Sequence, residues 1–197
     1  MKKLTVLILL LFLVANNYAQ QENLKNQFDY QIKQAVGDLN NDRLMDEVTI
    51  AMDTISPSRP FKIEVFLSQS NKPPKLIFSS TELIEAMYPT EKNGEHNGSQ
   101  IPDVYIEDGK LQLDFYIKGN SRYEFRYKNG KFELIHFSHV YFGGTTITET
   151  AFNLRTKKYT KRTEERNNSE VTLIKKKVRI KPLPLHKDFK PLENELY

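Results

Sequence analysis

Oxygen-bearing side chains alternate along one short segment near the N-terminus, Gly37-Asp38-Leu39-Asn40-Asn41-Asp42-Arg43-Leu44-Met45-Asp46. A loop that curls around a hard cation such as Ca²⁺ needs this alternation, because every second side chain then points inward and supplies an oxygen ligand. In such a loop position seven usually contributes a backbone carbonyl. The spacing therefore predicts a cation loop whose ligands are Asp38, Asn40, Asp42, the Leu44 carbonyl and Asp46.

Two interpretations of this loop stay open. Position six is normally glycine, which adopts a left-handed backbone without steric cost, and here it is Arg43. A non-glycine residue in that conformation costs about 1 kcal/mol. The alternative is therefore a turn that connects two strands, in which the Asp and Asn side chains cap their own backbone and hold no metal.

The segment resembles the calcium loops of FG-GAP/VCBS-type and integrin-like repeats, in which a pattern of the form GDLNxDGxxD leads into an alternating strand. The wider arrangement resembles a family of small secreted bacterial proteins with one such loop near the mature N-terminus. In that family a β-meander follows, and then a strand pair resembling TAFNLRTKKYT, residues 150–160 here. The resemblance extends over residues 30–163, and it implies a Ca²⁺ loop and assigns no catalytic residue.

The first nineteen residues have the parts of a cleavable signal peptide. Met1-Lys2-Lys3 is a positive start, an apolar run follows from Leu4 to Val14, and Ala19 is a small residue at the expected cleavage site. The run is too short for a transmembrane helix, which needs about 20 apolar residues. We therefore expect a signal peptide at 1–19, one domain at 20–181, and an extended tail at 182–197 with several prolines.

Export changes how the charge and composition are interpreted. The formal net charge of +4 includes Lys2 and Lys3, so the mature chain would carry only +2, which argues against nucleic acid as a partner. The chain has no cysteine, so the fold has no disulfide even in a periplasmic or secreted location. Its C-terminal third is basic, with eleven Lys and Arg residues against three Glu between Arg155 and Lys181. That excess indicates either a solvated sheet face or attraction to an acidic protein or an anionic polysaccharide.

Alternating apolar residues separated by turn signals predict a mainly β fold, an antiparallel meander or sandwich-like single domain with at most one short helix. The pattern is clearest in two expected strands, where Leu111, Leu113, Phe115 and Ile117 share one face, as do Tyr123, Phe125 and Tyr127. Asp108-Gly109 and Asn129-Gly130 are typical of tight hairpins. Further strands are expected at 47–52, 61–67, 75–78, 104–106, 132–137, 145–154, 158–164 and 171–180. A short helical piece is expected at 81–87.

No other constellation predicts chemistry strongly. His136 and His139 lie three apart on an expected strand and so face opposite sides, which argues against a zinc site. Nucleophile and phosphate-loop motifs are missing from the sequence. Pairs among Asp103, Glu107, Asp108 and Asp114 have the residue types that glycosidases use, although any acidic β protein offers such pairs.

The function expected from the sequence is a non-enzymatic, periplasmic or secreted β-rich domain, with a loop that Ca²⁺ stabilises. Its partner would be an envelope or extracellular protein or polysaccharide. Two alternatives stay open: an inhibitor or immunity-type protein that binds a hydrolase or toxin, and, third, a hydrolase with scattered acidic residues.

Overall fold

The computed structural model describes residues 28–97, 101–117, 119–167, 170–178 and 191. Its regular structure is antiparallel β-sheet, and the described residues form one helical turn only, the 3-10 helix η1 (Thr90–Lys92). This confirms the predicted mainly β fold. The expected signal peptide at 1–19 lies outside the described residues, and so does the expected tail at 182–197 except for Pro191.

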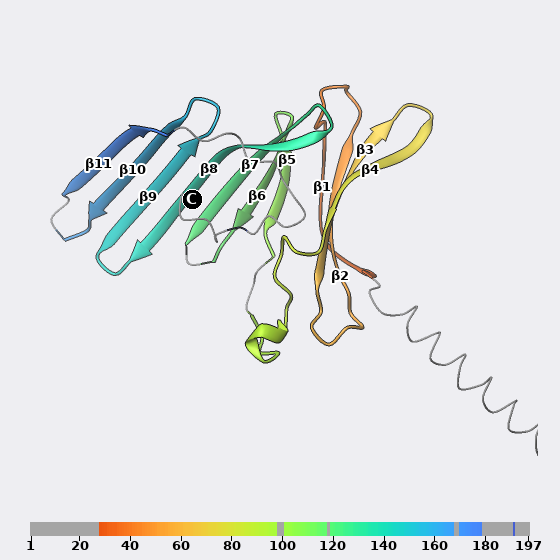
Figure 1. Cartoon of the computed structure of the whole chain (residues 1–197), viewed down its shortest axis with the longest axis horizontal. Helices are drawn as coiled ribbons and strands as arrows, with labels where there is room; N and C mark the ends of the chain where they lie inside the picture. The colour runs from red at the N-terminus through yellow and green to blue at the C-terminus, as the bar shows by residue number, and fades with distance from the viewer. Residues whose placement is uncertain (1–27, 98–100, 118, 168–169, 179–190, 192–197) are drawn as a thin grey trace, which may run out of the picture.

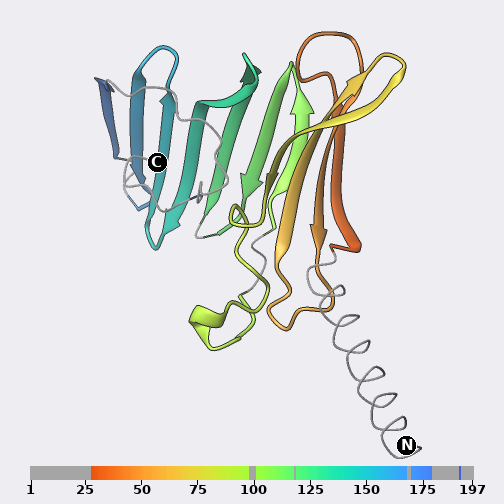
Figure 2. The same cartoon turned by 45° about the vertical axis from the view of Figure 1, so that its right-hand side comes forward.

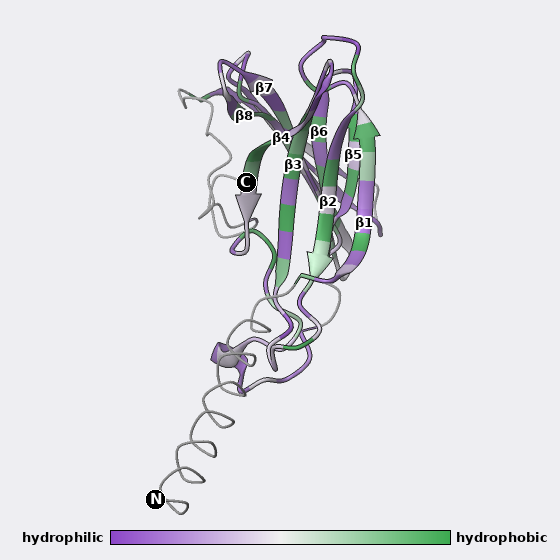
Figure 3. Ribbon diagram, turned by 90° about the vertical axis from the view of Figure 1, so that its right-hand side faces the viewer, coloured by the Kyte–Doolittle hydropathy of each residue, from purple (hydrophilic) through white to green (hydrophobic). Residues whose placement is uncertain are grey.

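The first sheet is a four-stranded antiparallel meander that carries the candidate loop. Its strands, in spatial order, are β1 (Tyr30–Gly37), β2 (Asp46–Met52), β3 (Phe61–Gln69) and β4 (Lys72–Ser80). Apolar residues alternate with more polar ones along β2 and the first half of β3 (Figure 3). Burial follows the same alternation there: Val48, Ile50, Ile63 and Val65 are completely buried, and their neighbours are partly buried. This is the alternation expected of strands with one face on a core.

The second sheet is a seven-stranded antiparallel meander in which every strand pairs with the next along the chain. Its strands are β5 (Asp103–Glu107), β6 (Lys110–Phe115), β7 (Asn120–Lys128), β8 (Lys131–Gly143), β9 (Thr146–Asn153), β10 (Lys158–Glu165) and β11 (Val171–Lys177). The turn residues Asp108 and Asn129 have positive φ angles of 50° and 52°. The expected Asp-Gly and Asn-Gly hairpins are therefore confirmed.

The first sheet lies at the β5 end of the long meander (Figure 2), and the two sheets meet where β1 lies beside β5 (Figure 1). Gly37, at the end of β1, is so close to β5 that a Cβ atom there would lie 2.6 Å from Ile106 Cγ2 and 2.9 Å from the Ile106 carbonyl oxygen. Lys33 Nζ lies 2.7 Å from Asp103 Oδ1 and adds an ion pair across the same junction. Contacts at this junction therefore join the sheet with the candidate loop to the long meander.

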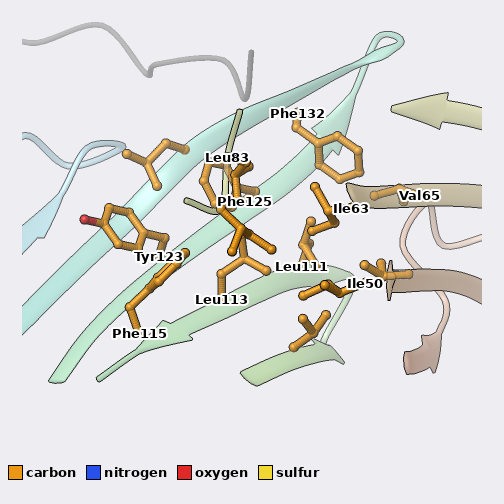
Figure 4. Packing of buried hydrophobic residues seen from close by; sticks show 14 of the residues in the cluster. Ile50, Ile63, Val65, Leu83, Leu111, Leu113, Phe115, Tyr123, Phe125 and Phe132 are labelled. Carbon is orange, nitrogen blue, oxygen red and sulfur yellow. The ribbon is translucent and has the colours of Figure 1, made fainter. Parts of the chain in front are cut away.

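The core lies between the first sheet and the β6–β8 part of the second (Figure 4). Leu111 and Leu113 of β6 and Tyr123 and Phe125 of β7 are fully buried, which confirms the predicted inward faces of both strands. Burying a side chain of this size contributes roughly 1.5–3 kcal/mol. Leu39 of the candidate loop is also buried, at 1% exposure, so the loop is anchored in the core from one end.

Two local expectations differ from the structure. Residues 81–87 form bends instead of the expected helical piece, because Leu83 and Ile84 both turn into the core although they are adjacent. Strand β4 starts at Lys72 and includes Pro73 and Pro74, so it is longer than the strand expected at 75–78. Proline is tolerated there because β4 is an edge strand of its sheet.

The second sheet continues past the core as β9, β10 and β11 (Figure 1). Every residue of β11 is exposed, and β10 has no fully buried residue. Phe152 and Leu154 are the last buried core residues on this side, and the partly buried Tyr159 and Val178 pack against the core. Beyond them the sheet is a layer open on both faces in the described part of the chain.

Candidate functional site

The candidate cation loop connects β1 to β2 and folds through hydrogen bonds from its own backbone. Asp38 accepts from the backbone N–H of Asp42 at 3.2 Å and of Arg43 at 2.8 Å, and Asn40 Oδ1 accepts from the Asp42 N–H at 3.0 Å. Asp42 Oδ1 in turn accepts from the Leu44 N–H at 2.8 Å. The side chains of residues 38, 40 and 42 therefore all point toward the inside of the loop, at the alternating positions that a cation loop requires.

Two left-handed residues give this loop its shape. Asn41 has φ of 62° and Arg43 has φ of 69°. Asparagine tolerates this region, whereas for arginine it costs about 1 kcal/mol. The backbone thus makes the turn that normally uses glycine at position six, and Arg43 makes it at a steric cost.

Asp46 is placed differently from the other expected ligands. It is fully buried at the start of β2, where Oδ2 accepts from the Leu39 N–H at 2.8 Å and Oδ1 accepts from the Ser68 N–H at 2.9 Å. Burial raises the pKa of its carboxyl group, and the nearby charges of Asp42 and Asp38 add to this, although the two N–H donors act in the opposite direction. Asp46 therefore ties the loop to β3 with both oxygens already engaged.

The structure brings Asp38, Asn40 and Asp42 together. One hydrogen bond between two of these side chains, from the Asn40 amide to the Asp42 carboxylate, would have to break for a cation to bind. Asn40 Nδ2 donates to Asp42 Oδ2 at 2.8 Å. The Asp38 side chain is partly exposed; desolvation raises the pKa of its carboxyl group, but backbone hydrogen bonds, that from Arg43 foremost, hold the pKa below its usual value. Leu44 lines a shallow depression of about 360 Å³ beside these residues.

The donor set fits a weak, partly hydrated Ca²⁺ site. Three side chains and the Leu44 carbonyl would provide four oxygens, whereas Ca²⁺ takes six to eight. Water would fill the remaining positions. Across the residues that the structure describes, no three His, Cys, Asp or Glu side chains form a group that could hold a metal ion, so the five-ligand assignment stays a prediction.

The two strand histidines lie on opposite faces of β8, as expected. His136 faces Glu124, with 3.5 Å between Nδ1 and Oε1, and this contact is the largest of those that lower the pKa of Glu124 to about 2. His139 Nδ1 lies 2.7 Å from Ser121 Oγ on the other face. Burial lowers the pKa of His139, which favours the neutral ring.

The Ser121–His139 pair is a nucleophile-like contact that the sequence did not reveal. The two residues are 18 apart and meet only because β7 and β8 pair in a register that places them opposite each other. A serine next to a neutral histidine has the composition of an activated nucleophile. The serine, however, is only 2% exposed, so this hydrogen bond contributes to packing at the margin of the core.

Of the four acidic residues raised by the sequence, Asp103 and Asp114 are engaged in ion pairs. Asp103 and Asp114 lie opposite each other on β5 and β6. Asp103 contacts Lys33, which lowers the pKa of its carboxyl group, and Asp114 accepts two hydrogen bonds from Arg122, at 2.9 and 2.7 Å. A general acid needs a raised pKa, and Asp103 has the opposite shift.

Comparisons with known proteins leave these assignments to the structure itself: no family model, curated protein or solved structure matches the chain. Within the described ranges, the structure includes no helix with the length and apolar character needed to cross a bilayer.

Proposed function

We propose that this protein is a non-catalytic binding domain that works in the periplasm or outside the cell and binds an envelope or extracellular partner. The observation that supports this most directly is the extension of the second sheet past the core. A domain that only needed to fold has no use for a layer of sheet whose two faces are open in the described part of the chain, because that layer buries little apolar area.

Strand β11 is the best-supported contact region. All seven of its residues are exposed, and Val171, Leu173 and Ile174 are 49%, 52% and 48% exposed. Apolar side chains that remain half exposed on an edge strand are a liability unless a partner covers them. Leu173 and Ile174 are adjacent and point to opposite faces, so a partner could use either face or the strand edge.

Ca²⁺ has a structural part in this proposal. Bound by Asp38, Asn40 and Asp42, the ion would neutralise two carboxylates that lie near buried Asp46. Because Leu39 and Asp46 anchor the same loop to the core and to β3, cation binding would stabilise the first sheet. Ca²⁺ would act on folding and would leave the partner surface on β11 unchanged.

Co-sedimentation with cell-envelope fragments tests the proposal. We expect the mature protein to sediment with the fragments and the double variant Leu173→Asn/Ile174→Asn to lose at least tenfold in bound fraction. Val36→Asn is the matched control, because Val36 is 54% exposed on an edge strand of the other sheet. Failure of the wild-type protein to sediment, or equal binding by all three proteins, would contradict the proposal.

A further inference from the structure

Among the residues that the structure describes, seven cations without an ion-pair partner gather at one end of the second sheet. They are exposed and come from the β7–β8 hairpin, the β9–β10 turn and the last residues of β11; we call them the basic turn row, which comprises Lys128, Lys131, Arg155, Lys157, Lys158, Lys175 and Lys177. The strand registers place all three segments at the same end, the upper edge in Figure 1.

The row differs from the middle of the same sheet in how its charges are compensated. There, Arg122 pairs with Asp114, Arg126 with Glu133, Lys110 with Glu124, and Arg162 with both Glu149 and Glu164. In the part of the chain that the structure describes, none of the seven cations of the basic turn row lies within ion-pair distance of an acidic side chain. Their charge is therefore available to a partner.

Two features of the row oppose folding. Lys128 lies directly opposite Lys131 across the β7–β8 hairpin, and Lys158 lies directly opposite Lys177 across β10 and β11. Like charges in such cross-strand positions are destabilising. Lys157 also has φ of 60°, a left-handed conformation that glycine or asparagine adopts more easily. Strain and repulsion that persist in a fold point to a role in binding.

We propose that the basic turn row is the binding surface for a linear acidic polysaccharide, one that carries carboxylate or sulfate groups along its length. This inference rests on the proposed function; it names the class of partner and adds a charged contact surface to the apolar one on β11. Bound anions would relieve both Lys–Lys repulsions, and this relief would make the free energy of binding more favourable than charge attraction alone would.

The arrangement of the row favours a chain-like partner. From β7 to β11 there are four inter-strand spacings, so the row extends over roughly 19 Å. Exposed neutral side chains, Asn129 and Thr156, stand between the cations and suit sugar hydroxyls. An anionic bilayer fits less well, because the exposed carboxylate of Asp42 and the partly exposed carboxylate of Asp38 lie at the same end of the molecule and would meet it too.

The test compares affinities of the mature protein for defined polymers at low and physiological salt, in EGTA. The probes are alginate, dextran sulfate, uncharged dextran, polyglutamate and vesicles that contain anionic phospholipid. We expect alginate or dextran sulfate to bind most tightly, with affinity that falls as salt rises, and uncharged dextran not to bind.

Variants of equal charge change make the test specific. The triple variant Lys157→Asn/Lys158→Gln/Lys177→Gln should lose at least tenfold in affinity, while its melting temperature stays the same or rises. Lys72→Gln/Lys75→Gln/Lys161→Gln, which changes cations outside the row, should keep the wild-type affinity. Asparagine at position 157 suits the left-handed turn, so lost binding would not reflect lost folding.

Three outcomes would overturn the inference: equal losses in both triple variants, tighter row-dependent binding to polyglutamate or vesicles, or no binding to either acidic polysaccharide. Envelope co-sedimentation separates these outcomes from failure of the proposed function. If the wild-type protein and the Lys157→Asn/Lys158→Gln/Lys177→Gln variant sediment equally well with the fragments, the domain binds a partner and the basic turn row is not its site.

Discussion

Single residues of the candidate loop show how much of its shape comes from side chains capping the backbone. Asp38, Asn40 and Asp42 accept hydrogen bonds from N–H groups of the loop itself, so the turn forms from protein groups alone. An oxygen that accepts one N–H still has a lone pair for a cation. A capped turn and a weak Ca²⁺ site are therefore compatible, and they differ in what added Ca²⁺ does to stability.

We expect millimolar Ca²⁺ to raise the melting temperature of the mature protein and EGTA to reverse the rise. A ligand at a hundred times its Kd contributes about 2.7 kcal/mol, which is easily measured. Asp38→Ala and Asp42→Ala should remove the response. Arg43→Gly should stabilise the protein by about 1 kcal/mol even in EGTA, because it removes the left-handed strain, and it should strengthen the response to Ca²⁺ by removing a nearby positive charge.

Scanning calorimetry with and without Ca²⁺ measures both effects, and Arg43→Ala serves as the control that removes the charge and keeps the strained backbone. A wild-type melting temperature that does not change when Ca²⁺ is added would show that the loop is a capped turn only.

Glu124 predicts an acid-sensitive contribution to stability. Its pKa falls from 4.5 to about 2 in the folded protein, chiefly through His136 and then through Lys110. Because the folded pKa lies below the unfolded one, the contribution is present above about pH 4.5 and is lost as the pH falls towards 2. Urea unfolding of wild type and Glu124→Gln should show a stability difference that shrinks across this window. A difference that is constant with pH would contradict the assignment; Glu149→Gln is the exposed control.

At the scale of strands and loops, the sequence predicted the inward faces of the strands and the tight hairpins, because local alternation and turn residues determine both. Leu111, Leu113 and Phe125 point inward because one face of a meander must be buried, and that face follows from the sequence period alone. The bends at 81–87 were not predictable in this way, because adjacent Leu83 and Ile84 fill a gap that exists only after both sheets have formed.

The same distinction between local and long-range contacts applies to the candidate site. The cluster of Asp38, Asn40 and Asp42 follows from spacing within one loop, so the sequence was sufficient to find it. The role of Asp46 depends on the N–H of Ser68 on β3, and the Ser121–His139 contact depends on the register of β7 and β8. Contacts between residues that are far apart in the sequence leave no local pattern.

Gly37 provides a test of the junction between the two sheets. Gly37→Ala should destabilise the protein, because the new methyl group would lie under 3.0 Å from both the side chain and the carbonyl oxygen of Ile106. Overpacking of this kind typically costs 1–3 kcal/mol. Ile106→Ala made together with Gly37→Ala should recover only part of the loss, since the carbonyl contact remains. Urea unfolding of the two single variants and the double variant measures this coupling, and an additive result would show that β1 and β5 do not approach closely in solution.

The whole molecule combines a packed half and an open half within one continuous meander. The first sheet covers β6, β7 and β8, and nothing in the described ranges covers β10 and β11. The exposed apolar residues of β11 lie on the open half, and so do five of the seven cations of the basic turn row; the other two, Lys128 and Lys131, are on the β7–β8 hairpin. Partner binding can therefore be gained or lost there with little effect on the core, which is the arrangement expected of a domain whose function is contact.

Native-state hydrogen exchange should separate these halves. Amides of β6 and β7 should exchange only through global unfolding, because their side chains form the core, whereas amides of β10 and β11 should open at lower free energy with a smaller denaturant dependence. Leu113→Ala should lower the protection of β6 and β7 by about 2–5 kcal/mol and leave the opening of β10 and β11 unchanged. Leu173→Ala should change stability little in either half, because Leu173 is half exposed. If all amides instead share one opening free energy and shift together with Leu113→Ala, the layer beyond the core is part of the same cooperative unit. The exposed residues of β11 would then reflect its position as the edge strand and no separate open half.

Hydrogen exchange with saturating acidic polysaccharide gives the complementary measurement. The polysaccharide should raise the opening free energy of β10 and β11 selectively, since it binds the open half and not the core.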